Sequence, residues 1–217
     1  MRRLVIFDLD GTLVNSIADL AVAVNQALVK CGYPTHPEEA YRFMVGDGVN
    51  KLFERALPES ERMAENVARI REHFMPFYEE HNADLSRPYE GIPELLEELQ
   101  RRGVLMAVAS NKYHSATCKL IAHFFPTIHF HPVFGNREGV PVKPDPRIVD
   151  DIVATLGVDK SDLLYVGDTN VDMRTAINAG VDAVGVSWGF RPREELAAHS
   201  PFALIDHPTQ LLPLLDR

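Results

Sequence analysis

The chain has few cysteines, no excess of basic residues and no long apolar runs, and each of these features excludes a class of protein. Its two cysteines, Cys31 and Cys118, fit no metal-ligand spacing and are too few for a disulfide framework. The 31 acidic residues outnumber the 22 basic ones and leave a formal net charge of −9. This charge argues against a nucleic acid or an anionic membrane as the main partner. A small anionic substrate is still allowed, because a bound metal ion and one or two lysines can reverse the sign locally.

The apolar runs are also too short for a membrane span or a secretory signal. The first run, "LVIF" at residues 4–7, is broken at Asp8. We therefore expect a cytoplasmic protein with no membrane partner. Its 217 residues, 46% of them hydrophobic, suffice for one sizeable core, or for one core with a small accessory domain.

Apolar segments alternate with helical patterns along most of the chain. The helical segment that starts near Ile92 carries Pro93 in its first turn and ends at Gly103. A later one has Asp145 as its expected N-cap and ends at Gly157. Near-continuous apolar strands separated by helices predict a Rossmann-like α/β fold, with a doubly wound parallel sheet covered on both faces. After the first run, the expected strands are 104–110, 128–135, 163–169, 183–188 and 202–206.

Residues 15–84 have a different pattern, because helical stripes follow one another there without a convincing strand between them. The third of these stripes is expected to be disturbed at Pro76. We interpret this block as an all-helical cap domain inserted after the first strand. The α/β core would then be discontinuous and consist of residues 1–14 and 85–217.

Polar residues gather where the expected strands end. Ligands of open α/β sheets bind at the carboxyl ends of the strands, and applying this rule brings together Asp8, Asp10, Ser110, Asn111, Asp168 and, from a nearby loop, Lys143. Three carboxylates, a lysine and a hydroxyl suit a divalent cation and a phosphoryl group. Mg²⁺ prefers oxygen ligands and often shares the phosphate oxygens of a substrate.

These residues resemble the motifs of the haloacid dehalogenase (HAD) superfamily of phosphohydrolases. The resemblance rests on "DLDGT" at 8–12, Ser110, Lys143 and "GDTNVD" at 167–172, in the family's order. It covers the whole chain, since a helical cap after the first strand is also a family feature. Within the superfamily the chain is most similar to phosphoglycolate phosphatases and their close relatives, through "VGDGVNKLFERAL" in the cap and "GDTNVDMRTAINAG" near the end.

The resemblance implies a role for each motif residue. Asp8 would be the nucleophile that forms an aspartyl-phosphate, and Asp10 the general acid and then the general base. Ser110 would hydrogen-bond the phosphate, and Lys143 would neutralise its charge. The implied cofactor is Mg²⁺, held by Asp8, by the backbone carbonyl of Asp10 and by Asp168.

Several further residues are candidates with less defined roles. Asp172 would be an outer metal ligand or would orient Asp168 or Lys143, but it can equally form a capping box with Thr169. Lys51 and Arg55 are interpreted as a solvated helix face. The candidates for binding phosphate or the rest of the substrate are Gly11, Thr12, Asn111, Gly46 and Gly48.

The substrate stays open at this point. Dehalogenases and phosphonate hydrolases of the superfamily replace the acid two residues after the nucleophile, so Asp10 favours a phosphate ester. We expect a small phosphorylated metabolite, with 2-phosphoglycolate the best candidate, and a monomer or a homodimer. The alternatives are a β-phosphoglucomutase-like phosphotransferase, a pyrophosphatase and, from another class, a non-catalytic phospho-accepting signalling protein. Receiver domains of that last kind are about half this length and need no helical insertion.

Overall fold

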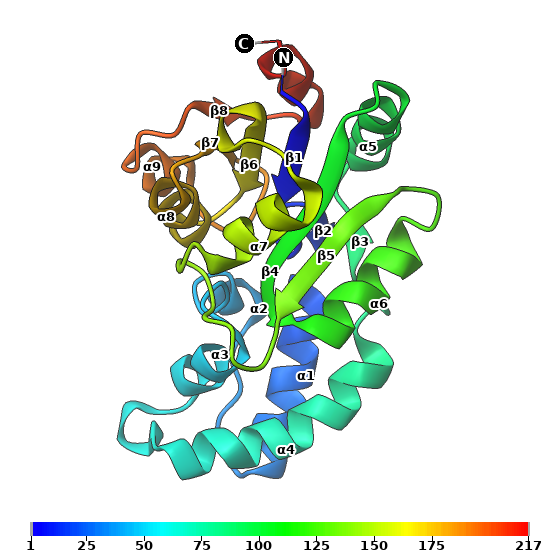
Figure 1. The fold of residues 1–217 in the computed structure, drawn as a ribbon. Coiled ribbons are helices and arrows are strands. Elements are labelled where there is room, and N and C mark those ends of the chain that lie inside the picture. Colours follow the sequence, from blue (N-terminus) through cyan, green and yellow to red (C-terminus); the bar gives the residue numbers. More distant parts are fainter. Residues whose placement is uncertain (1, 217) are drawn as a thin grey trace.

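A computed structural model describes residues 2–216 and shows a six-stranded parallel sheet (Figure 1). Its strand order is β5-β4-β1-β6-β7-β8, so the chain runs outward from β1 in one direction and then in the other. This reversal is the topology of a doubly wound fold, as expected, and it creates a crevice at the carboxyl ends of the central strands. The strands are β1 (Leu4–Phe7), β4 (Leu105–Tyr113), β5 (Phe130–Asn136), β6 (Leu163–Gly167), β7 (Asp182–Val186) and β8 (Ala203–Ile205).

Both faces of the sheet are buried under helices. Alternate residues of each strand point to opposite sides, so each strand contributes to the hydrophobic clusters on both faces. In β1, Val5 and Phe7 join one hydrophobic cluster, while Leu4 and Ile6 join another. The first cluster is covered by α5 (Ile92–Arg101), α6 (His114–Phe124) and the 3₁₀ helix η3 (Pro208–Leu214). The second is covered by α7 (Arg147–Leu156), α8 (Asn170–Ala179) and α9 (Arg193–Ala197). The short 3₁₀ helix η2 (Lys160–Asp162) precedes β6.

A group of helices lies at the carboxyl end of β1 and β4 (Figure 1). It consists of α1 (Ile17–Lys30), α2 (Glu38–Tyr41), α3 (Val49–Ala56), the 3₁₀ helix η1 (Glu59–Glu61) and α4 (Ala64–His81). These helices surround a third hydrophobic cluster, to which the α/β part contributes Phe190. The chain leaves and re-enters the α/β part through a two-stranded antiparallel pair, β2 (Val14–Asn15) and β3 (Arg87–Pro88).

Helix α4 contains Pro76 and continues through it, because packing of its apolar face on α1 outweighs the missing backbone hydrogen bond. One local expectation was wrong. Helix α7 has Pro146 rather than Asp145 at its N-cap, although Asp145 Oδ1 still accepts a hydrogen bond from the Arg147 backbone N–H at 2.9 Å. Within residues 2–216, no helix is long and apolar enough to cross a membrane.

Candidate active site

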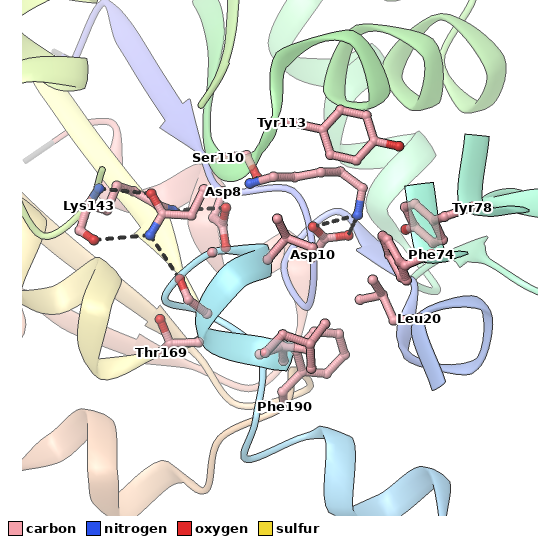
Figure 2. Close-up of a pocket in the computed structure, with 17 residues that line it drawn as sticks. Asp8, Asp10, Leu20, Phe74, Tyr78, Ser110, Tyr113, Lys143, Thr169 and Phe190 are labelled. Carbon is pink, nitrogen blue, oxygen red and sulfur yellow. Dashed lines mark hydrogen bonds and ion pairs between the residues drawn. The ribbon is translucent and has the colours of Figure 1, made fainter. Parts of the chain in front are cut away.

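The two aspartates that follow β1 face different partners. The Asp8 carboxylate is buried, and its Oδ1 lies 2.9 Å from the Nζ of Lys143. The Asp10 carboxylate turns instead toward Ser16, whose Oγ donates to Oδ1 at 2.5 Å. It also faces Lys112, whose Nζ lies 2.9 Å from both carboxylate oxygens (dashed lines at Asp10 in Figure 2). Each of these two carboxylates therefore lies beside a different lysine, which offsets part of its charge.

The turn after Asp10 supports a third aspartate. Gly11 has a φ of 92°, and a Cβ at this position would collide with the carboxylate of Asp168. Thr12 Oγ1 donates to Asp168 Oδ1 at 3.0 Å. Both residues were expected to bind substrate, but neither lines the cavity described below. What they contact in the structure is Asp168.

Asp168 follows β6 and is fully buried. Its Oδ2 accepts a hydrogen bond from the backbone N–H of Phe190 at 2.8 Å. Burial and the nearby carboxylates of Asp172 and Asp8 raise the pKa of Asp168 well above its ordinary value, although the Phe190 N–H and Thr12 oppose the increase. A cation beside this carboxyl would favour its charged form.

Asp172 combines two of the roles considered for it. Its backbone N–H donates to Thr169 Oγ1 at 3.3 Å, and its Oδ2 accepts from the Thr169 backbone N–H at 3.1 Å, which completes a capping box at the start of α8. Its Oδ1 lies 2.7 Å from Lys143 Nζ and accepts from the hydroxyl of Tyr165 at 3.2 Å. The helix cap thus fixes a carboxylate that in turn holds Lys143.

Lys143 is buried at the centre of this network. Besides Asp8 and Asp172, its Nζ donates to the Ala109 carbonyl at 2.9 Å and to the Tyr165 hydroxyl at 3.1 Å. Burial lowers the pKa of this ammonium, but the two carboxylates outweigh burial and raise the pKa well above its ordinary value. Lys143 therefore carries a positive charge at any physiological pH.

The end of β4 connects the site to the helical group. Ser110 is buried, and its Oγ accepts a hydrogen bond from the Lys112 backbone N–H at 3.1 Å. Asn111 Oδ1 accepts from the Lys143 backbone N–H at 2.8 Å. Its Nδ2 donates to the carbonyls of Lys143 and Gly46, at 3.0 and 2.9 Å. One amide thus holds the Lys143 loop and the 45–48 turn of the helical group against the sheet.

The helical group contributes this turn to the site, and the turn needs glycine. Gly46 and Gly48 have φ angles of 116° and 89°, which other residues rarely adopt. The Lys51 side chain is exposed and pairs with Glu54. Arg55 is paired with Asp47, which fits the interpretation that neither cation faces the site.

A cavity lies between the sheet edge and the helical group (Figure 2). Its empty volume is about 590 Å³, with the open mouth included. Its polar end is formed by Asp8, Asp10, Ser110, Asn111, Lys112, Lys143 and Thr169. The remaining wall consists of Leu20, Val45, Gly46, Gly48, Val49, Leu52, Phe74, Tyr78, Tyr113 and Phe190.

Three buried carboxylates at this site could hold a metal ion. One oxygen from each of Asp8, Asp168 and Asp172 lies within 4.8 Å of the others. Burial raises the pKa of Asp8 to about 7, with a further increase from Asp172 that Lys143 partly offsets. A divalent cation would relieve this cost, and three oxygen donors fit Mg²⁺. The carboxylate of Asp10 does not belong to this group. Asp10 could therefore contribute to the metal site only through its backbone carbonyl.

Sequence reasoning missed Lys112, Ser16 and the backbone N–H of Phe190. For Lys112 there was a signal, because it follows Ser110 by two residues on the same strand and therefore shares its face. For the Phe190 N–H there was none, since a backbone donor leaves no mark on the residue type.

Comparison with known proteins places the chain among hydrolases. The family model for haloacid dehalogenase-like hydrolases matches residues 5–186. A phosphoglycolate phosphatase from Vibrio parahaemolyticus is 34% identical over 98% of this chain and 96% of its own length. One from Pseudomonas syringae pv. tomato is 35% identical over 98% of this chain and 79% of its own length.

Solved structures agree in fold. A crystal structure from Lactobacillus delbrueckii subsp. bulgaricus superposes with a TM-score of 0.93 at 30% identity and covers 99% of both chains. A predicted phosphoglycolate phosphatase from Haemophilus somnus gives a TM-score of 0.90 at 28% identity, over 98% of this chain and 97% of its own.

Proposed function

Because the chain belongs to the haloacid dehalogenase-like hydrolase family, we propose that it is a Mg²⁺-dependent phosphatase that hydrolyses a small organic phosphate monoester. Relatives that match 98% of the chain are named phosphoglycolate phosphatase, which makes 2-phosphoglycolate the preferred substrate of this proposal. The observation that carries the proposal is the pairing of Asp8 with Lys143 at the floor of a cavity beside two more buried carboxylates.

Asp8 is the nucleophile in this scheme. Its carboxylate oxygen forms a bond to phosphorus while the bond from phosphorus to the ester oxygen breaks, and the product on the protein is an aspartyl-phosphate. Lys143 and the hydroxyl of Ser110 bind the phosphoryl oxygens, whose charge needs positioning and neutralisation more than covalent chemistry. Bound Mg²⁺ would supply further positive charge at those oxygens, held by Asp8 and Asp168, whose carboxylates the structure brings together, and, as the family resemblance implies, by the backbone carbonyl of Asp10.

Asp10 handles the protons in both steps. In the first step its carboxyl donates a proton to the departing alkoxide. In the second it accepts a proton from a water molecule, whose oxygen attacks phosphorus and releases both inorganic phosphate and the Asp8 carboxylate. The separation of the two carboxylates in the structure suits this division, because Asp10 faces Lys112 and Ser16 rather than the nucleophile's lysine.

We further propose that residues 15–84 act as a cap domain over a core of residues 1–14 and 85–217. Helices α1–α4 surround a hydrophobic cluster to which the α/β part adds Phe190, and the chain crosses between the two parts at the β2–β3 pair. The cap contributes the 45–48 turn and apolar side chains to the cavity wall. It would therefore shape the pocket for the organic part of the substrate and exclude water from it.

The test is phosphate release with Mg²⁺ from 2-phosphoglycolate, beside β-glucose 1-phosphate, pyrophosphate and 4-nitrophenyl phosphate. We expect a preference for 2-phosphoglycolate, inhibition by EDTA and no turnover by Asp8→Asn. Conversion of β-glucose 1-phosphate to its isomer, or a preference for pyrophosphate, would assign the same chemistry to another substrate. If none of these compounds releases phosphate, with or without Mg²⁺, the proposal is wrong.

A further inference from the structure

Two lysines line the cavity within the described part of the chain, and only one has a function so far. Lys143 is assigned to the phosphoryl oxygens, and its Nζ also contacts Asp8, Asp172, the Ala109 carbonyl and the Tyr165 hydroxyl. The other is Lys112, whose side chain is only 5% exposed. A buried ammonium is costly, so its position at the cavity wall needs a reason.

Lys112 has unused hydrogen-bonding capacity. Its Nζ donates to the two oxygens of Asp10, both at 2.9 Å. It also lies 5.0 Å from the centre of the Tyr78 ring, a cation–π distance. The ammonium carries three N–H groups, and the ring and one carboxylate leave room for a further acceptor.

Two more donors without partners lie at the same end of the cavity. Tyr78 and Tyr113, both labelled in Figure 2, line the cavity, and the centroids of their rings lie 6.4 Å apart. Among residues 2–216, their hydroxyl groups are buried and have no hydrogen-bond partner. Buried polar atoms without partners are rare in folded proteins, and here they adjoin an ammonium, so an anionic acceptor would satisfy all three groups.

The position of Lys112 shows which part of a substrate would meet it. A general acid must touch the ester oxygen of the leaving group. Lys112 is hydrogen-bonded to that acid, Asp10, so the next one or two atoms of the leaving group must pass close to its ammonium. Leu20 and Phe74 add apolar surface to this cavity, with the Phe74 ring stacked on that of Tyr78, and among the described residues Lys112 and Lys143 are the only cations that line it.

We infer that Lys112, together with the Tyr78 and Tyr113 hydroxyls, binds a carboxylate on the leaving group. The site would thereby select short phosphate esters that carry a second anionic group one or two carbons from the ester oxygen. The inference deepens the proposed function and rests on it. Lys112 lies on β4 and Tyr78 on cap helix α4, so this anion site is complete only when the two parts of the molecule are together.

The experiment compares two esters of matched length, 2-phosphoglycolate and 2-hydroxyethyl phosphate, which has a neutral hydroxyl in place of the carboxylate. We would measure kcat/KM for both with the wild type, Lys112→Met, Lys112→Arg and the control Lys51→Met, which removes an exposed lysine outside the cavity. Lys112→Met should reduce the preference for the carboxylate ester about 10- to 100-fold, the range for a lost charged hydrogen bond. Lys112→Arg should retain part of the preference and Lys51→Met all of it.

The outcomes separate this inference from the proposed function. An equal loss on both esters in Lys112→Met would show that Lys112 only supports Asp10, and the inference would be wrong. A wild type that hydrolyses both esters equally well would also overturn it, while the phosphatase would stand. If the wild type releases phosphate from neither ester, the proposed function fails and the inference with it.

A second variant covers the case in which Lys112→Met does not fold. Tyr78→Phe keeps the aromatic ring and leaves the Lys112 ammonium in place, but it removes one hydroxyl. It should reduce the preference for 2-phosphoglycolate several-fold. In addition, glycolate should inhibit hydrolysis of 4-nitrophenyl phosphate by the wild type more strongly than ethylene glycol does. An unchanged preference in Tyr78→Phe together with no difference between the two inhibitors would contradict the inference.

Discussion

The Asp8→Asn substitution separates the chemical role of this carboxylate from its effect on the stability of the fold. Asp8 is the proposed nucleophile, so the variant should lose turnover. It should nevertheless be more stable than the wild type at pH 8 in the absence of metal. Burial and the neighbouring Asp172 make the charged form of Asp8 costly, and asparagine has nearly the same shape without the charge.

The magnitude and its pH dependence follow from the pKa. Asp8 has a pKa of about 7 in the folded protein against 3.8 for an unperturbed carboxyl, so between these values the folded protein binds more protons than the unfolded chain. Stability that protonated Asp8 contributes at low pH is therefore lost as the pH rises through about 7. At about 1.4 kcal/mol per pH unit, the cost approaches about 4 kcal/mol at pH 8 and less than half of that at pH 5. Asp8→Asn avoids this cost.

The assay is urea unfolding in EDTA at pH 5 and pH 8, followed by the fluorescence of Trp188. This is the chain's single tryptophan, and its Nε1 donates to the Thr12 carbonyl beside the site. The control Asp84→Asn removes an exposed carboxylate and should change the unfolding free energy by less than about 0.5 kcal/mol. A variant less stable than the wild type at pH 8, or equally stabilised at both pH values, would refute the electrostatic reasoning. With Mg²⁺ in place of EDTA, the wild type should recover more stability than the variant.

Three further substitutions test other parts of the site. Asp10→Asn should reduce kcat at least about tenfold more for 2-phosphoglycolate than for 4-nitrophenyl phosphate, whose leaving group needs no proton, and equal losses would contradict the role of general acid. Lys143→Met should lower the unfolding free energy in EDTA at pH 8 by about 3–5 kcal/mol, because Asp8 and Asp172 lose their buried partner. A much smaller loss in urea unfolding would contradict this role of Lys143. Gly11→Ala should cost about 1–3 kcal/mol and weaken activation by Mg²⁺, since its Cβ would displace Asp168; a Mg²⁺ titration with unchanged half-activation would argue against that contact.

The sequence could predict the α/β sheet because its signals are local. Apolar runs such as 163–167 give a buried strand, and glycines such as Gly103 and Gly157 mark helix ends. The rule that ligands bind at strand ends then predicts that Asp8, Asp168 and Lys143 share one site. The structure indeed places their side chains in one network.

The orientation of Asp10 could not be predicted in this way. It depends on Lys112, which is 102 residues away in the sequence and meets Asp10 only when β4 pairs with β1. The same limit applies to Thr12, whose contact with Asp168 spans 156 residues. Motif spacing identifies which residues share the site, but partners far apart in sequence decide which way each side chain turns.

The division of charge between the two lysines explains how neighbouring aspartates can have different tasks. Asp8 shares Lys143 with Asp172, so its charge is only partly compensated, and a metal ion would complete the balance. Asp10 has Lys112 and the Ser16 hydroxyl to itself, which keeps its side chain away from the other carboxylates. A nucleophile must remain tied to the metal and phosphate, whereas an acid–base group must reach the leaving group and water. Exchanging the two residues' partners would therefore disable both tasks, even though every catalytic side chain would still be present.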